Sequence, residues 1–176
     1  GKNAAVYLAK FLKDVVTTKQ SKDFVDFIVN VFDKDHLGTA LEFDYEDPMS
    51  GPTTLNPGIV TFNEHGASIE VSMRYSVTYP FEEKITKVQV LLQQEVFTLD
   101  VVNNSNPHYV SEEDELIQTL LQVYRKYSND FSKPLSTGGG TYARVMKKGV
   151  AFGMLFPGEP DIAHQANEFV DIENLI

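Results

Sequence analysis

The stretch IVTFNEHGASIEVSMRYSV, residues 59–77, decides the fold class. Two runs rich in β-branched and apolar residues flank the short turn at residues 64–66, which predicts a β-hairpin. The second run alternates between apolar Ile69, Val71, Met73, Tyr75 and Val77 and polar Ser68, Glu70, Ser72, Arg74 and Ser76. This alternation is typical of a strand with one buried and one polar face, so we expect an antiparallel pair.

Helices are expected on both sides of this hairpin because apolar residues recur there at spacings of three and four. They cover residues 1–16, 21–34, a segment that begins at Pro80, and residues 111–129. Ser21 is expected to cap the second helix, and Ser111 with Asp114 resembles the capping box of the last one. Residues 96–101 are predicted to form another strand, and residues 36–58 to be mostly irregular.

The order of these elements predicts an α+β fold. With one more strand in front and one helix fewer, the order up to residue 103 would be that of the ferredoxin-like unit. We therefore expect an antiparallel sheet with helices on one face. Residues 103–107, Asn-Asn-Ser-Asn-Pro, form the best linker candidate. Residues 1–105 are thus expected to form one domain, and residues 106–176 to belong to another.

The composition excludes several classes of protein. The chain has 176 residues, of which 42% are hydrophobic and 23% charged, as in ordinary globular domains. Its 15 basic and 25 acidic residues give a net charge of −10, which argues against a nucleic-acid partner. No apolar run reaches the roughly 20 residues of a membrane helix, so no membrane association is expected. Cysteine is absent, which excludes thiolate metal sites and fits a cytoplasmic location.

The histidines do not suggest a complete metal site. None of His36, His65, His108 and His164 is spaced to share a helix face or a strand with another. A catalytic zinc needs about three protein ligands and an open position, and no such set is evident. Glu168, four residues after His164, would share a helix face with it and favours that histidine slightly.

A glycine-rich segment and one arginine are the other candidates. Residues 136–144, Ser-Thr-Gly-Gly-Gly-Thr-Tyr-Ala-Arg, are predicted to run from a strand through a turn into a short helix. Such a turn could hold an anion against free backbone N–H groups, but a flexible connection explains the pattern equally well. Arg74 could bind a carboxylate through two parallel hydrogen bonds. The pattern alone favours a surface arginine paired with Glu70.

Several segments together resemble the zinc dipeptidases. These are TGGGTYAR (137–144), VAFG (150–153), FPG (156–158) and AHQANE (163–168), preceded by GKNAA (1–5), GPTTLN (51–56) and MRY (73–75). In this order they are similar to the aminoacylase and glutamate-carboxypeptidase family of co-catalytic metallopeptidases. The resemblance is greatest to the dipeptidase V, carnosinase-like branch, and it covers essentially the whole chain.

The resemblance implies a function and a set of site residues. The implied enzyme hydrolyses dipeptides with a free terminal carboxylate, using water activated by two zinc ions, with manganese or cobalt as alternatives. His164 matches the family's last zinc ligand, and Arg74 matches a lid residue that reaches the substrate carboxylate. The loop that faces the same carboxylate is matched by Gly138, Gly139, Gly140 and Thr141.

The resemblance also implies a partial enzyme. The family's other metal ligands and its general base belong to motifs that this sequence lacks. The helical pattern at Gly1 and the apolar ending at Ile176 likewise suggest a piece of a longer protein. We therefore expect residues 1–105 to be part of a lid domain, residues 106–176 to be the C-terminal part of an α/β catalytic domain, and the isolated chain to be inactive.

Two other functions remain open from the sequence. One is a non-catalytic acidic domain whose glycine-rich loop binds a small carboxylate. The other is a dimerisation domain that forms a homodimer through the lid sheet. An enzyme needs a full ligand shell near His164, a binding domain needs an occupied glycine loop, and a dimerisation domain needs a strand edge paired between chains.

Overall fold

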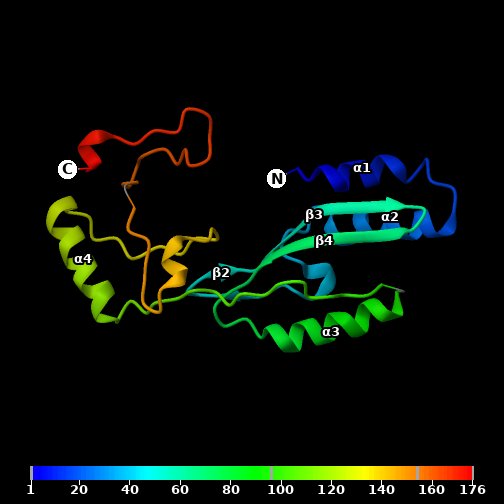
Figure 1. Cartoon of the computed structure of the whole chain (residues 1–176), viewed down its shortest axis with the longest axis horizontal. Coiled ribbons are helices and arrows are strands. Elements are labelled where there is room, and N and C mark those ends of the chain that lie inside the picture. The colour runs from blue at the N-terminus through cyan, green and yellow to red at the C-terminus, as the bar shows by residue number, and fades with distance from the viewer. Residues whose placement is uncertain (1, 96, 154, 176) are drawn as a thin grey trace. The chain divides into compact units, whose positions relative to one another are not determined.

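A computed structural model describes residues 2–95, 97–153 and 155–175 and divides the chain into two compact units (Figure 1). Unit 1 comprises Gly1–Tyr109 and Pro134–Gly138, and unit 2 comprises Val110–Lys133 and Gly139–Ile176. The described residues form helices before and after two small antiparallel sheets, which confirms the α+β class. The division at residues 105 and 106 into a lid part and a catalytic part stays a prediction.

Unit 1 begins with two helices, α1 (Ala4–Leu12) and α2 (Lys19–Phe32). The Asn3 side chain caps α1 by accepting hydrogen bonds from the next turn. The predicted cap of α2 was wrong, because Thr18 takes that place and accepts a 3.2 Å hydrogen bond from the backbone N–H of Ser21. Ser21 lies inside the helix and is buried.

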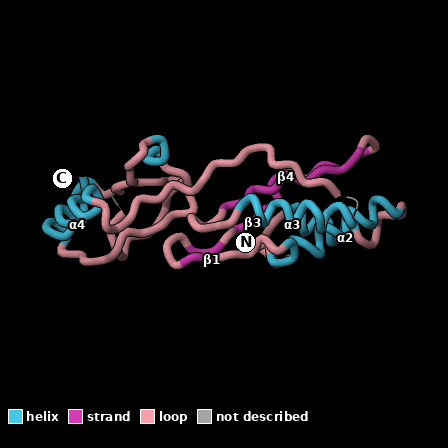
Figure 2. The backbone as a smooth tube through the Cα atoms, turned by 90° about the horizontal axis from the view of Figure 1, so that it is seen from below, coloured by secondary structure: helices cyan, strands magenta, loops and turns pink. Residues whose placement is uncertain are grey.

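The predicted hairpin is formed by β3 (Thr54–Asn63) and β4 (Gly66–Arg74). Leu55 pairs with Met73 and Val60 with Ile69, so these four side chains share the face that packs on the helices. In Figure 2, α2 and α3 (Phe81–Gln94) lie along one side of this hairpin. The expected buried face is therefore present, although Val71 in its middle is 40% exposed.

The second strand ends earlier than predicted. We expected it to continue to Val77, but β4 stops at Arg74. Ser76 and Val77 instead form hydrogen bonds with Gly51 and Ser50, next to the short pair β1 (Glu46–Asp47) and β2 (Gly51–Pro52). These bonds turn the chain away from the hairpin directly after Arg74.

The core of unit 1 lies between the helices and the hairpin. It contains side chains from α1, α2, α3, the 3₁₀ helix η1 (Thr39–Leu41) and β3. The stripe predicted on α3 consists of Phe81, Ile85, Val88 and Leu92, and it is confirmed: the last three are buried, and Phe81 packs partly buried against the core. Burial of such apolar surface is the main force that stabilises a domain of this size.

The strand predicted at residues 96–101 was wrong for residues 97–101, which form no strand; Val96 lies outside the described residues. Phe97 packs on Phe27 with ring centroids 4.2 Å apart, and Leu99 accepts a hydrogen bond from the Gln89 side chain. Side-chain packing and a side-chain hydrogen bond therefore hold this extended segment where a backbone ladder was expected.

Unit 2 contains α4 (Glu115–Ser128) and the short 3₁₀ helices η2 (Tyr142–Val145) and η3 (Ile172–Leu175). The predicted end of α4 is confirmed, because Asn129 adopts the left-handed C-cap conformation. Its N-cap is Asp114, whose side chain accepts from the backbone N–H of Leu116. Ser111, which we expected at that position, lies three residues earlier and accepts from the Glu113 N–H.

Candidate functional site

Arg74 lies at the exposed end of β4, opposite Thr54 in the hairpin register. Within the described residues it forms no ion pair with Glu70, so the surface pairing considered from the sequence is absent. Its guanidinium instead lies against the first glycine of the glycine-rich segment. A Cβ atom placed on Gly138 would lie 3.3 Å from Arg74 Nη1, closer than most side chains tolerate.

The glycine-rich segment is divided between the two units. Gly138 belongs to unit 1, where the Ser136 hydroxyl anchors the preceding irregular segment by donating a 2.6 Å hydrogen bond to the Met49 carbonyl. Residues 139–141 belong to unit 2. Two sequence-predicted residues, Arg74 and Gly138, are thus brought together within unit 1, 64 positions apart in the chain.

The remaining part of the loop leads into a short helix. Thr141 is the N-cap residue of η2, as the expected helix after the glycines requires, but its side chain makes no capping bond. A Cβ atom on Gly140 would lie 2.9 Å from Arg144 Nη1, so this glycine also allows a guanidinium to approach the backbone. The strand predicted before the glycines was wrong, because residues 133–137 form no strand.

His164 lies in an exposed turn of unit 2 and not in the expected helix. His164 and Asn167 both have a φ of 63°, a left-handed conformation that a continuous α-helix cannot contain. Glu168 nevertheless contacts His164, since its carboxylate accepts a 3.1 Å hydrogen bond from the His164 backbone N–H. Within the part of the chain that the structure describes, no three His, Asp or Glu residues form a group that could hold a metal ion.

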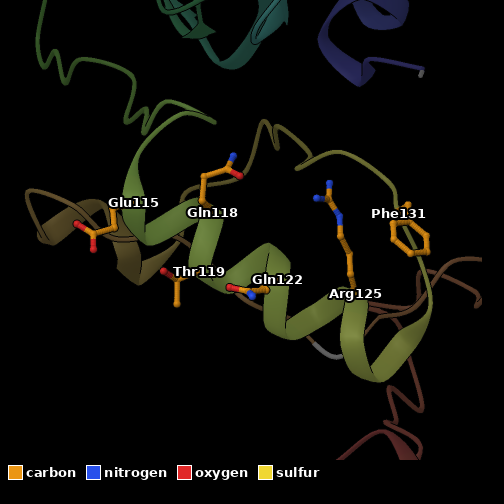
Figure 3. A pocket seen from close by; sticks show the side chains of 6 residues that line it. All are labelled: Glu115, Gln118, Thr119, Gln122, Arg125 and Phe131. Carbon is orange, nitrogen blue, oxygen red and sulfur yellow. The ribbon is translucent and has the colours of Figure 1, made fainter.

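A shallow hollow on unit 2 has no evident chemistry. It is lined by Glu115, Gln118, Thr119, Gln122, Arg125 and Phe131 (Figure 3). The first five side chains come from α4, and Phe131 comes from the segment that follows it. None of the residues implicated by sequence lines this hollow. We therefore centre the candidate site on Arg74 and Gly138.

Sequence analysis missed one polar residue near this pair. Asp47 is 4% exposed, and its carboxylate accepts hydrogen bonds from Met49, Ser50 and Thr78. Burial by itself raises the pKa of Asp47, but the bonds from Ser50 and Thr78 outweigh it and hold the pKa well below its ordinary value. An Asp followed by Pro-Met-Ser-Gly is the pattern of an Asx-type turn, which could have indicated this role.

Comparison with known proteins identifies the family. A family model described as peptidase family M20/M25/M40 matches residues 15–176. The chain therefore belongs to this peptidase family. No helix among the described residues of this M20-family chain has the length and apolar character needed to span a membrane.

Three bacterial relatives of this M20-family chain are each named as a putative dipeptidase. The protein from Bacillus subtilis is 39% identical over 177 residues, and those from Staphylococcus saprophyticus and Staphylococcus epidermidis are 35% and 33% identical over 176 and 177 residues. These matches cover 99–100% of this chain. The chain spans 38% of the length of each relative.

Proposed function

We propose that this chain is part of a longer, metal-dependent dipeptidase of the dipeptidase V branch. The proposed reaction is hydrolysis of the peptide bond in dipeptides with a free terminal carboxylate. Membership of the M20/M25/M40 family and the dipeptidase names of its relatives support this proposal. The relatives' greater length is consistent with a chain that supplies only some of the active-site residues.

The single observation that carries the proposal is the position of Arg74 beside Gly138. A guanidinium offers parallel N–H donors that match the two oxygens of a carboxylate. The absent side chain of Gly138 leaves room next to that group, and Arg74 is exposed to an incoming ligand. Arg74 would thus hold the terminal carboxylate of the dipeptide. Gly139, Gly140 and Thr141 follow in the sequence, and their role toward that carboxylate stays a prediction from the family resemblance.

His164 would supply one metal ligand in the longer protein. The described residues do not make a metal site by themselves, because a catalytic zinc takes about three protein ligands. When bound, two zinc ions would activate the attacking water; manganese and cobalt are alternatives. We therefore expect the isolated chain to lack peptidase activity. A homodimer formed through the lid sheet and a cytoplasmic location also stay predictions.

The test compares a dipeptide with its C-terminal amide in the full-length enzyme. Arg74→Ala should lower kcat/KM for the free-carboxylate dipeptide by roughly 10–100-fold, since a charge-assisted contact is worth about 1.5–3 kcal/mol. It should change hydrolysis of the amide much less. Arg74→Lys should restore only part of the loss, because an ammonium lacks the planar fork. Equal losses on both substrates would contradict the proposed role of Arg74.

A further inference from the structure

A buried carboxylate connects the two segments that follow β1 and β4. Asp47 Oδ1 accepts hydrogen bonds from the Met49 N–H at 3.0 Å, the Ser50 N–H at 2.6 Å and the Ser50 hydroxyl at 2.8 Å. Its Oδ2 accepts from the N–H and the hydroxyl of Thr78, both at 3.0 Å. Both oxygens therefore accept hydrogen bonds from neutral donors. Through these bonds Asp47 holds together two segments that are 31 positions apart in the sequence.

The first branch of this network fixes the end of β4. The Ser50 hydroxyl, which donates to Asp47, also accepts a 2.9 Å hydrogen bond from the Val77 N–H. The Ser76 hydroxyl donates to the Gly51 carbonyl, and Ser76 is 1% exposed. Residues 76–78, shortly after Arg74, are thus hydrogen-bonded to Asp47 or to the turn that its carboxylate stabilises. This fixes the direction in which the backbone leaves Arg74.

The second branch fixes the glycine-rich segment. The Met49 N–H donates to Asp47, while the Met49 carbonyl accepts the 2.6 Å hydrogen bond from the Ser136 hydroxyl. Ser136 precedes Gly138 by two residues, and Gly138 lies against the Arg74 guanidinium. One carboxylate is therefore connected through Met49 to the glycine and through Ser50 and Thr78 to the arginine.

We propose that Asp47 is a positioning residue, which holds Arg74 and Gly138 together in the geometry that binds the substrate carboxylate. This inference rests on the proposed function and adds a residue to it. Asp47 is buried and does not itself face the substrate; it acts through the two segments. Its lowered pKa is consistent with a group that stays charged at neutral pH, since both oxygens accept hydrogen bonds.

Asp47→Asn is the direct test because it keeps the shape of the side chain. The new amide group can serve as acceptor through one atom only, so its NH2 would face either the donors of Met49 and Ser50 or those of Thr78. We expect the preference for a free-carboxylate dipeptide over its amide, measured as a ratio of kcat/KM values in the full-length enzyme, to fall about tenfold. The loss should appear mainly in KM.

Asp35→Asn is the matched control. Asp35 is also in unit 1 and accepts hydrogen bonds from the backbone of Leu37, Gly38 and Ala40; among the described residues these bonds stay within one local turn, away from Arg74. Asp35→Asn should therefore reduce thermal stability without changing the acid-to-amide ratio, which is kcat/KM for the free-carboxylate dipeptide divided by kcat/KM for its amide. A fall in the ratio of the same size in both variants would show a general structural effect and would overturn the inference.

Ser136→Ala provides a second test if Asp47→Asn does not fold. This variant removes one exposed hydrogen bond between the glycine-rich segment and Met49, so folding should be kept. The acid-to-amide ratio should fall about threefold. Ser132→Ala, which removes the hydroxyl that donates to Asp130 in unit 2, should leave it unchanged.

The outcomes separate this inference from the proposed function. If Arg74→Ala leaves the preference for the free carboxylate intact, the proposed function fails and takes the positioning role with it. If Arg74→Ala removes the preference while Asp47→Asn or Ser136→Ala retains the wild-type ratio, only the positioning role is overturned. Both the proposed function and the positioning role are supported if Arg74→Ala, Asp47→Asn and Ser136→Ala lower the acid-to-amide ratio and the two control variants do not.

Discussion

The two units differ sharply in how much apolar surface they bury. Among the described residues, unit 1 has a core of fourteen buried apolar residues, which come from three helices, η1, the hairpin and the loops that hold Phe43 and Tyr79. In unit 2, among the described residues, the buried hydrophobic side chains are those of Ile117 and Ala143 only. Large apolar side chains such as Phe131, Val145 and Phe169 are mostly exposed there. Aromatic contacts of Tyr124 with two phenylalanines supply part of its packing.

This difference bears on how each candidate site residue is held. Arg74 and Gly138 lie on a frame that combines the packed hairpin with the buried Asp47 network. His164 lies in a turn stabilised by local hydrogen bonds, such as the one to Glu168. Because burial is the main source of stability, we expect unit 1 to be the more stable of the two and its site geometry to be the better defined.

The largest loss of activity is expected from a substitution in unit 2, the less packed of the two units. His164→Ala in the full-length enzyme should lower zinc content and reduce turnover by at least about 10–100-fold, the range seen when residues that only support metal ligands are lost. Unfolding of unit 1 should be unchanged. His65→Ala is the control, because His65 is exposed in the hairpin turn. Wild-type zinc content and rate in His164→Ala would contradict the assignment.

Core truncation should separate the two units by stability. Val88 on α3 is 1% exposed, so Val88→Ala should lower the free energy of unfolding by about 2 kcal/mol. Val123 on α4 is 48% exposed, and Val123→Ala should change it by no more than about 0.5 kcal/mol. Urea titrations of the chain and of both variants measure these changes in the free energy of unfolding. Similar losses would mean that the packing contrast is wrong.

Acid should weaken unit 1 through Asp47. The pKa of Asp47 in the folded chain lies below its ordinary value of 3.8, so the unfolded chain takes up the proton first as the pH falls. The stabilisation is complete above about pH 5 and is lost as the pH falls below 3.8 toward the folded pKa.

Urea titrations at pH 6 and at pH 3 measure this loss. Asp47→Asn should start from a lower stability and lose less of it between the two pH values than the wild type. Asp23→Asn, which removes an exposed ion pair with Lys19, is the control and should keep the wild-type pH dependence. An unchanged loss in Asp47→Asn would show that Asp47 does not contribute to the acid sensitivity.

The smallest effect is expected at the start of α4. Asp114→Ala removes the side chain that caps the helix, which should cost about 1 kcal/mol. Amide hydrogen exchange should then become faster in α4 and stay unchanged in α2 and α3. Ser111→Ala should have a smaller effect, because the Ser111 hydroxyl accepts its hydrogen bond from Glu113, in the turn before the helix. The reverse order would restore Ser111 as the cap that the sequence predicted.

Sequence patterns predicted the elements that form because of the periodicity of their own side chains. The hairpin and the apolar stripe of α3 follow from periodicity, and both are present. The predictions failed where a distant contact decides the outcome. The strand after Arg74 ends because the chain bonds to Ser50 and Gly51, and residues 97–101 are held by Phe27 and Gln89.

The candidate site could be predicted only in part for the same reason. Motif resemblance pointed to Arg74, Gly138 and His164 one at a time, without the distance between any two of them. The approach of Arg74 to Gly138 and the bond of Ser136 to Met49 both join residues far apart in the chain, and no local pattern contains either of them. Asp47 was missed because an Asx-type turn predicts a local bend and not its bonds to Thr78.

The most direct test of the central claim observes Arg74 itself in this chain. The sequence has three arginines, Arg74, Arg125 and Arg144, so their side-chain Nε–H signals can be assigned in a ¹⁵N NMR spectrum with Arg→Lys variants. If Arg74 beside Gly138 binds a terminal carboxylate, a dipeptide should shift the Arg74 signal saturably, its C-terminal amide should not, and the Arg125 signal should stay in place. An Arg74 signal that responds equally to the acid and the amide, or to neither, would contradict the account.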